Sequence, residues 1–278
     1  MNSDDNILSI EDLRVRFTTV LGTFDAVCGI TFTVRRGRTL AVVGESGSGK
    51  SVTGYSILRL IQPPGKITSG KILFTPRDEK PTDIAALPEN SPNLLALRGG
   101  KIGMIFQEPM TALSPVHTIG DQLTEGVRIH QNLSKSSAEK LACEMMTRVG
   151  ITDPQRRLRQ YPFEFSGGMR QRIVIAMALM SRPQLLIADE PTTALDVTVQ
   201  AQVLKLLRDL RDELSMSVIF ITHDLGVVAQ IADDVIVMNQ GEIVERGSVR
   251  DVLRHPAHPY TQKLLDAVPR FEPMEASS

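Results

Sequence analysis

A glycine-rich segment combines the residue types that bind a triphosphate. It fits the pattern G-x-x-x-x-G-K-[ST] and runs Gly44, Glu45, Ser46, Gly47, Ser48, Gly49, Lys50 and Ser51, with Val52 next in the chain. Such a loop presents backbone N–H groups and a helix N-terminus to phosphates. Lys50 would reach the β- and γ-phosphates, and the Ser51 hydroxyl would bind Mg²⁺. The alternative, a glycine turn with a solvated lysine, leaves the flanking patterns unexplained. The segment therefore predicts a site for a nucleoside triphosphate.

The flanking elements would position this loop. Residues 39–43 are apolar and partly β-branched, as in a buried strand, and residues 52–61 have the apolar spacing of a helix. Residues 13–17 and 30–34 alternate as short strands. Residues 75–100 are rich in Pro, Asn, Asp and Glu, which predicts a surface insertion before a strand at 102–106.

The second half of the chain alternates between helical and strand patterns. Residues 108–181 are predicted to be mostly helical, with one helix that starts near Ser136 and closes at Gly150. The later elements are two apolar strands at 185–188 and 218–221, a helix between them at 203–214, and a hairpin of strands 235–238 and 242–245. The strand–helix–strand unit is expected to be parallel and right-handed.

Composition limits the class of protein. The 278 residues are 42% hydrophobic and 23% charged, with a net charge of −1, which is typical of a globular protein and argues against a general nucleic-acid-binding surface. The longest apolar run, eight residues from Ile173 to Met180, is far shorter than the ~20 that span a bilayer. The N-terminus carries Asp4 and Asp5 and lacks the features of a signal peptide. Cys28 and Cys143 lack metal-ligand spacing and are expected to be small buried hydrophobes in a reducing cytosol.

Several short segments follow the loop in a fixed order. They are Gln107 at a strand end, Phe165–Arg172 opening an apolar helix, Leu185–Glu190, Ala194–Asp196, and His223 at a strand end. Together they resemble the nucleotide-binding subunit of ATP-binding-cassette (ABC) transporters. The resemblance implies an α/β P-loop NTPase fold, with a RecA-like mixed sheet core, an antiparallel β subdomain and an α-helical signature subdomain.

The resemblance also implies domain bounds. The ABC ATPase domain would span residues 7–269, with 7–107 and 182–247 as core and β subdomain and 108–181 as helical subdomain. Residues 248–278 would form a C-terminal tail.

The chemistry of four polar residues agrees with ATP hydrolysis. Asp189, at the end of an apolar strand, would hold Mg²⁺ together with Ser51 and Gln107. Glu190 would act as general base toward the attacking water, and the resemblance gives His223 a contact to the γ-phosphate. The alternatives are a capping or salt-bridged glutamate, a strand-end glutamine bound to backbone, and a structural histidine.

Ser166, Gly167 and Gly168 form an anion site by construction, because glycines allow close approach and a helix starts there. The resemblance implies that they complete the ATP site of a partner subunit, with Asp196 crossing the interface. Helix capping is the alternative for Ser166. Phe165 stands where the family usually has Leu, so the fine fit at that position is open.

An aromatic residue is expected to stack on adenine. Phe17 lies 33 residues before Lys50, about where the family places that aromatic. Core packing is the rival interpretation of Phe17, and Phe24 is a second candidate for the stacking role.

Two stretches, 104–115 and 255–265, resemble ATPases for dipeptide, oligopeptide, glutathione, nickel and opine import. His255 and His258 are predicted to belong to a structural tail, since two prolines and the lack of a third ligand argue against a metal site. Longer relatives carry a C-terminal cysteine cluster, and its absence from the sequence predicts no iron–sulfur cluster.

The resemblance implies an assembly on a membrane. The ATPase, which converts ATP and water to ADP and phosphate, would serve two permease subunits, an extracytoplasmic solute-binding protein and a second ATPase that is a related chain or a second copy. Its place would be peripheral, on the cytoplasmic face of the bacterial inner membrane. The lobe at residues 108–165 would carry the groove for the permeases.

Three other functions remain alternatives. One is a non-transport ABC ATPase, such as an accessory subunit of phosphonate breakdown, and another is a nucleic-acid-directed ATPase. A regulatory subunit without hydrolysis is disfavoured because Glu190 and His223 are both present.

Overall fold

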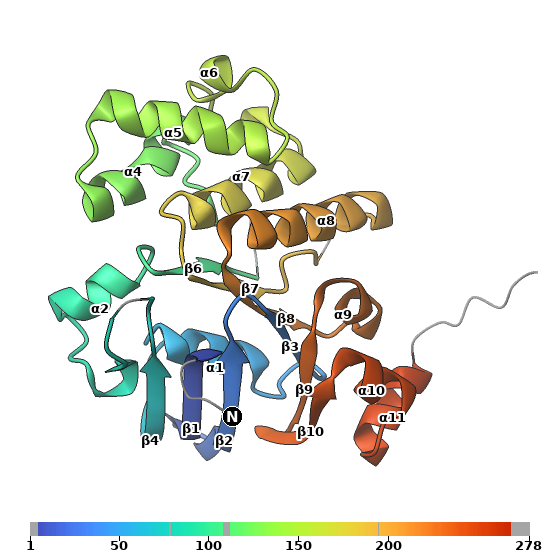
Figure 1. Ribbon diagram of the computed structural model, residues 1–278. Helices are drawn as coiled ribbons and strands as arrows, with labels where there is room; N and C mark the ends of the chain where they lie inside the picture. The colour runs from blue at the N-terminus through green and yellow to red at the C-terminus, as the bar shows by residue number, and fades with distance from the viewer. Residues whose placement is uncertain (1–4, 78, 108–111, 194, 268–278) are drawn as a thin grey trace, which may run out of the picture.

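Two β-sheets and a lobe of helices make up the fold (Figure 1). The structure is a computed structural model that describes residues 5–77, 79–107, 112–193 and 195–267. The predicted strand–loop–helix and strand–helix–strand units are both present, and the helical lobe lies on one side of the larger sheet.

The larger sheet has six strands in the order β10-β9-β3-β8-β7-β6, and all neighbours are parallel except β10 with β9. Its strands are β3 (Thr39–Val43), β6 (Ile102–Ile105), β7 (Leu185–Asp189), β8 (Ser217–Thr222), β9 (Asp234–Asn239) and β10 (Glu242–Ser248). The parallel pairing of β7 and β8 through α8 (Val197–Leu214), and the hairpin of β9 and β10, confirm the sequence predictions.

Both faces of the central strands of the larger sheet are covered, which explains why β3, β7 and β8 are buried along their whole length. On β7, Leu185 and Ile187 face the core shared with the smaller sheet. Leu186 and Ala188 face the core shared with the helical lobe. Side chains alternate along a strand, so a strand buried on both faces needs an unbroken apolar run.

The smaller sheet is antiparallel, with strand order β2-β1-β4-β5. Its strands are β1 (Asn6–Thr19), β2 (Gly22–Arg35), β4 (Gly65–Phe74) and β5 (Thr82–Asp83). The strands predicted at 13–17 and 30–34 are too short, because register shifts interrupt the alternation of β1 and β2 although the pairing continues.

The prediction of a surface insertion at 75–100 is wrong in part. This segment contains β5, the short helix η2 (Ile84–Ala86) and α2 (Pro92–Leu97). Ile84 and Leu94 are fully buried in the same core as the smaller sheet. The polar, proline-rich composition of residues 75–100 gave no indication that these two apolar side chains are buried in the core.

The helical lobe contains α4 (Ile119–Gln131), α5 (Lys135–Arg148), α6 (Pro154–Arg157), η3 (Pro162–Glu164) and α7 (Gly167–Leu179). Ser134 caps α5 by accepting the N–H of Ser137, so this helix begins one residue before the predicted start. The lobe, α8 and one face of β6, β7 and β8 share a single apolar core.

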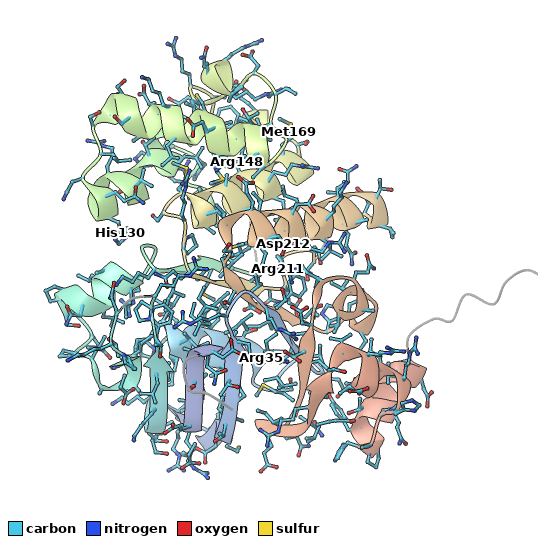
Figure 2. The ribbon with its side chains drawn as sticks, in the orientation of Figure 1. Arg35, His130, Arg148, Met169, Arg211 and Asp212 are labelled. Carbon is cyan, nitrogen blue, oxygen red and sulfur yellow. The ribbon has the colours of Figure 1, made fainter. Side chains whose placement is uncertain are left out.

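An aspartate pair at the start of β9 ties distant elements together. Arg35 from β2 binds both carboxylate oxygens of Asp234 at 2.6 Å. Arg211 from α8 donates to Asp233 at 3.2 Å and to Thr39 at 3.1 Å. Figure 2 shows these two arginines within the body that contains the larger sheet.

Two further predictions concern the burial of the two cysteines and the presence of membrane-spanning helices. Cys28 and Cys143 are free and half-buried rather than fully buried, and burial raises the pKa of both thiols. Within the described ranges, no helix combines the length and the apolar character needed to cross a bilayer.

Candidate functional site

The glycine-rich loop lies between β3 and α1 (Lys50–Ile57). The helix begins at Lys50, two residues before the predicted start, so Lys50 and Ser51 belong to its first turn. Gly49 has a φ of 98°, and a Cβ atom there would collide with the carbonyl oxygen of Ala26. Only glycine allows this loop to pass so close to β2.

Lys50 is a buried cation at the centre of the loop. Its side chain is 4% exposed, and Nζ donates to the carbonyl oxygens of Gly44 at 2.8 Å and Glu45 at 2.7 Å. Burial lowers the pKa of Lys50. Carbonyls satisfy its hydrogen bonds without neutralising its charge, so an anionic ligand is the favourable partner.

Asp189 ends β7 beside the loop. Its Oδ1 accepts a hydrogen bond from the Ser51 hydroxyl at 2.9 Å. Its Oδ2 is buried and accepts no hydrogen bond of good geometry among the described residues, although the Tyr55 hydroxyl interacts with this carboxyl. Burial raises the pKa of Asp189. A buried carboxylate next to a serine hydroxyl suits a divalent cation.

The donor set narrows the kind of cation. The side chains that meet here are the Ser51 hydroxyl and the Asp189 carboxylate, which form a small set of oxygen donors. A site with few protein ligands fits Mg²⁺, which keeps water and binds substrate phosphates.

Glu190 and His223 meet at the ends of neighbouring strands. Glu190 has a φ of 46°, and its N–H donates to the carbonyl of Ile221 at 2.9 Å. Its Oε1 lies 3.2 Å from Nδ1 of His223. The Glu190 side chain is 11% exposed and that of His223 is 58% exposed. The left-handed backbone, uncommon for a residue with a side chain, aims the carboxylate at the rim of the site.

Two further side chains hold the segment around Glu190, and the sequence interpretation gave neither a role. The hydroxyl of Thr193 donates to Oε2 of Glu190 at 2.9 Å. Gln171, 1% exposed on α7, donates through Nε2 to the carbonyl of Pro191. The one feature of the sequence that could have pointed to these residues is their position. Gln171 lies within the Phe165–Arg172 segment, and Thr193 lies between Glu190 and Asp196.

A pocket of about 250 Å³ joins the loop to these groups. Its lining comprises Phe17, Phe24, Ala26, Ser46, Gly47, Gly49, Lys50, Ser51, Val52, Gln107 and Glu190. Sequence reasoning selected all of these except Ala26. A larger hollow of about 910 Å³ lies in the helical lobe and is separate from this chemistry.

Both aromatic candidates line the pocket. The rings of Phe17 and Phe24 stack with centroids 5.5 Å apart and planes at 9°. Phe17 also packs against the core of the smaller sheet, whereas Phe24 is 55% exposed. Phe17 therefore contacts both the core and the pocket, whereas the ring of Phe24 is more exposed to a ligand in the pocket.

Ser166, Gly168 and Asp196 form a second cluster that does not line this pocket. Ser166 caps α7 by accepting the N–H of Met169 at 3.4 Å, and Asp196 caps α8 by accepting the N–H of Val199 at 2.9 Å. A Cβ atom on Gly168 would lie 3.2 Å from the Val199 side chain, so the two helix N-termini are adjacent. Ser166 thus has the capping contact of the alternative interpretation, a contact that is compatible with a role at a partner's site, and the cluster leaves two helix ends side by side.

Comparison with known families identifies this arrangement. The family profile described as ABC transporter matches residues 27–193, which include the loop, Asp189 and Glu190. The chain belongs to the ABC transporter family. It is an ATPase whose hydrolysis of ATP is coupled to transport.

Individual relatives support this membership. The chain is 52% identical to the dipeptide transport ATP-binding protein DppD of Bacillus subtilis over 269 residues, which cover 96% of this chain and 78% of DppD. It is 51% identical to the oligopeptide transport ATP-binding protein OppD of the same organism over 267 residues, which cover 96% and 73%. The glutathione import ATP-binding protein GsiA of Escherichia coli is 49% identical over 271 residues, which are 97% of this chain and 43% of GsiA.

Solved structures confirm the predicted fold. The ABC subunit cbiO1 of Clostridium perfringens matches with a TM-score of 0.74 and 29% identity, covering 90% of this chain and 92% of that one. A dimeric ATP-binding cassette bound to ADP and phosphate matches with a TM-score of 0.75 and 26% identity, covering 87% and 99%. The mixed sheet core, antiparallel β subdomain and α-helical subdomain are those of an ABC ATPase.

A second profile matches the end of the chain. The profile described as the C-terminal region of oligopeptide/dipeptide transporters covers residues 244–277, of which those from 268 onward lie outside the described part. Within it, His258 caps α11 (Pro259–Asp266) by accepting the N–H of Tyr260 on Nδ1 at 3.2 Å. His258 therefore has a structural contact in the tail.

Proposed function

We propose that this ATPase powers the import of peptides or related small solutes. The observation that carries the proposal is the match of residues 244–277 to the oligopeptide/dipeptide transporter C-terminal region. The named relatives, about 50% identical over the aligned residues, are named for dipeptide transport, oligopeptide transport and glutathione import, and none of them is named for phosphonate breakdown. The residues facing the solute would belong to other subunits, so the solute itself is a matter for experiment.

The site residues have distinct proposed roles in hydrolysis. Residues 44–52 would cradle the phosphates, with Lys50 moving its ammonium from the Gly44 and Glu45 carbonyls to the phosphates. Ser51, Asp189 and Gln107 would hold Mg²⁺, and the contact of the buried Asp189 carboxylate with the Ser51 hydroxyl supports this assignment. Bound Mg²⁺ would neutralise charge on the phosphate oxygens.

Glu190 would take a proton from the attacking water. Its Oε1 is beside His223, and its Oε2 accepts from Thr193, so the carboxylate is oriented at both oxygens. His223 would contact the γ-phosphate through the face that solvent now covers, since its side chain is 58% exposed. Phe17, with Phe24, would contact the adenine.

In a dimer of ATPase subunits, each pocket would be completed by residues of the partner subunit. The pocket of about 250 Å³ is small for a whole nucleoside triphosphate, which supports coverage by a partner. Ser166, Gly167, Gly168 and Asp196 would supply that cover from the partner ATPase, a related chain or a second copy. Their adjacent helix N-termini suit the γ-phosphate.

The helical lobe would receive the permeases. Its groove of about 910 Å³ is lined by both acidic and basic side chains from α4 and the preceding loop. They include His117, Asp121, Glu125 and Arg128. The assembly would include two permeases and an extracytoplasmic solute-binding protein, and it would place this chain at the cytoplasmic face of the bacterial inner membrane.

Reconstitution tests this function. Affinity purification of the tagged chain from membranes should retain permease subunits, and the complex in proteoliposomes should hydrolyse ATP faster when peptide-loaded binding protein is added. The matched control is the same complex with Lys50→Ala, which should lose the peptide response. Capture of a soluble enzyme complex without permeases would overturn the proposal.

A further inference from the structure

The C-terminal segment touches the phosphate loop directly. The hydroxyl oxygen of Tyr260 accepts a hydrogen bond from the backbone N–H of Glu45 at 3.0 Å, although the two residues are 215 positions apart. Tyr260 lies in α11, which sits with α10 (Val249–Arg254) beside β9 and β10 (Figure 1). A region defined by its likeness to peptide transporters therefore reaches the nucleotide site.

The peptide groups around Glu45 are held at both ends of this residue. Its carbonyl oxygen accepts from Nζ of Lys50 at 2.7 Å and from the N–H of Ser48 at 3.2 Å. Tyr260 holds the N–H of the same residue. Because peptide groups are rigid planes, fixing the N–H and the carbonyl leaves this part of the loop little freedom.

Apolar packing holds Tyr260 against the base of the loop. The Tyr260 ring packs, with Leu264, on a cluster that contains Ala41 and Val43 of β3, the strand that leads into the loop. Burial raises the pKa of Tyr260, so its hydroxyl remains protonated and neutral at physiological pH. The Tyr260 ring therefore packs on the same strand, β3, that leads into the phosphate loop.

A carboxylate clamp fixes where α11 starts. Glu245, in β10, accepts the N–H of Ala257 on Oε1 at 2.8 Å and the N–H of His258 on Oε2 at 3.0 Å. A register shift in the β9–β10 ladder lies between Ile243 and Glu245. Such irregularities re-aim side chains, and here the result is a turn that delivers Tyr260 to the loop.

We propose that residues 245–265 are a positioning element of the phosphate loop, with Tyr260 as the residue that holds Glu45. The proposal rests on ATP binding at this loop and is independent of which solute the transporter imports. A loop held in this way needs less ordering when the nucleotide arrives, and reduced ordering raises affinity.

The variant Tyr260→Phe removes only the hydroxyl and keeps the packed ring. We expect the Kd of the full chain for a non-hydrolysable ATP analogue with Mg²⁺ to rise about five-fold, the size expected for one hydrogen bond. Without nucleotide, the Glu45 amide should exchange with solvent about ten-fold faster by NMR. The melting temperature should stay within about 2 °C of wild type.

Two further variants separate positioning from general stability. Tyr161→Phe removes a phenol hydroxyl in the helical lobe and should change neither Kd nor Glu45 exchange. Glu245→Gln keeps one carbonyl acceptor for the turn before α11. It should therefore raise the Kd and the exchange rate of the Glu45 amide by a smaller factor than Tyr260→Phe does. This variant also provides the test if Tyr260→Phe folds poorly.

Two results would overturn the proposal. One is an unchanged Kd in Tyr260→Phe and Glu245→Gln despite faster exchange at Glu45. The other is a weaker Kd with unchanged Glu45 exchange and a lowered melting temperature, which would mark α11 as a general support. Neither result bears on peptide import, which the reconstitution tests separately.

Discussion

Nδ1 of His223 lies 3.2 Å from Oε1 of Glu190, and the two residues follow the neighbouring parallel strands β8 and β7. The remaining oxygen of Glu190 accepts from Thr193. The proposed base is therefore oriented from two directions, by one residue 33 positions away and by one only three positions away.

Glu190→Gln should preserve ATP binding and slow hydrolysis by about 100-fold or more, because positioned proton transfer typically contributes that much. Single-turnover hydrolysis and equilibrium ATP binding measure the two effects. Thr193→Val, which removes only the hydroxyl that orients Oε2, should cost much less. Normal hydrolysis by Glu190→Gln would mean that another group is the base.

Lys50→Ala should abolish ATPase activity while the fold persists. The ammonium is the cation at the centre of the loop, and its partners in the absence of ligand are backbone carbonyls that water can bind instead. ATPase turnover of the assembled complex and circular dichroism of the purified chain test the two parts. Turnover like that of wild type would refute the role of this loop in phosphate binding.

Asp189→Asn should remove the dependence of ATP affinity on Mg²⁺. It should also raise the free energy of unfolding of the chain without ligand by about 1 kcal/mol, because burying an ionised carboxylate is costly and burial raises the pKa of Asp189. Titration of ATP with and without Mg²⁺, together with denaturant unfolding, measures both. A Mg²⁺ dependence that survives in Asp189→Asn would assign the cation to other ligands.

Phe17→Ala and Phe24→Ala should each weaken ATP affinity by about 1 kcal/mol, the size of a lost stacking contact. Phe17→Ala should also lower the melting temperature, because Phe17 packs in part against the core. Phe24 is 55% exposed, so Phe24→Ala should leave the melting temperature nearly unchanged. Unchanged affinity in Phe17→Ala with a lowered melting temperature would leave Phe17 as a core residue.

Gly167→Asp should fold normally and bind ATP as the isolated chain. Apart from its chain neighbours and its own helix backbone, no described residue has an atom within 4 Å of the position that its Cβ would occupy, and the phosphate loop is untouched. In the assembled transporter the same variant should block ATP-driven closure and hydrolysis at the partner's site, because a carboxylate would face the γ-phosphate. Gly167→Ala is the uncharged control.

Two measurements decide this prediction, ATP affinity of the isolated subunit and turnover of the full complex. Loss of binding in the isolated subunit would show that the glycine pair serves the chain's own fold. Full turnover of the Gly167→Asp complex would show the same.

Local order along the chain was enough to predict the phosphate loop and the strand-end residues. Gly44–Ser51 is a contiguous motif, and Asp189, Glu190 and His223 each follow an apolar run. Because parallel strands end at one edge of a sheet, these residues lie close together in the structure: Asp189 accepts a hydrogen bond from Ser51, and Glu190 meets His223. The lengths of β1 and β2 and the burial of Ile84 and Leu94 were not predictable from local pattern, since register shifts and long-range packing decide them.

The sequence by itself determined the types of chemical group and their order along the chain. Only the tertiary structure decided which atoms face each other across long separations, such as Tyr260 with Glu45, and which charged groups are buried, such as the carboxyl of Asp189. The physical reason is that a hydrogen bond needs its two groups within about 3 Å and aligned. That geometry arises from strand pairing and core packing over the whole fold, and no local motif encodes it.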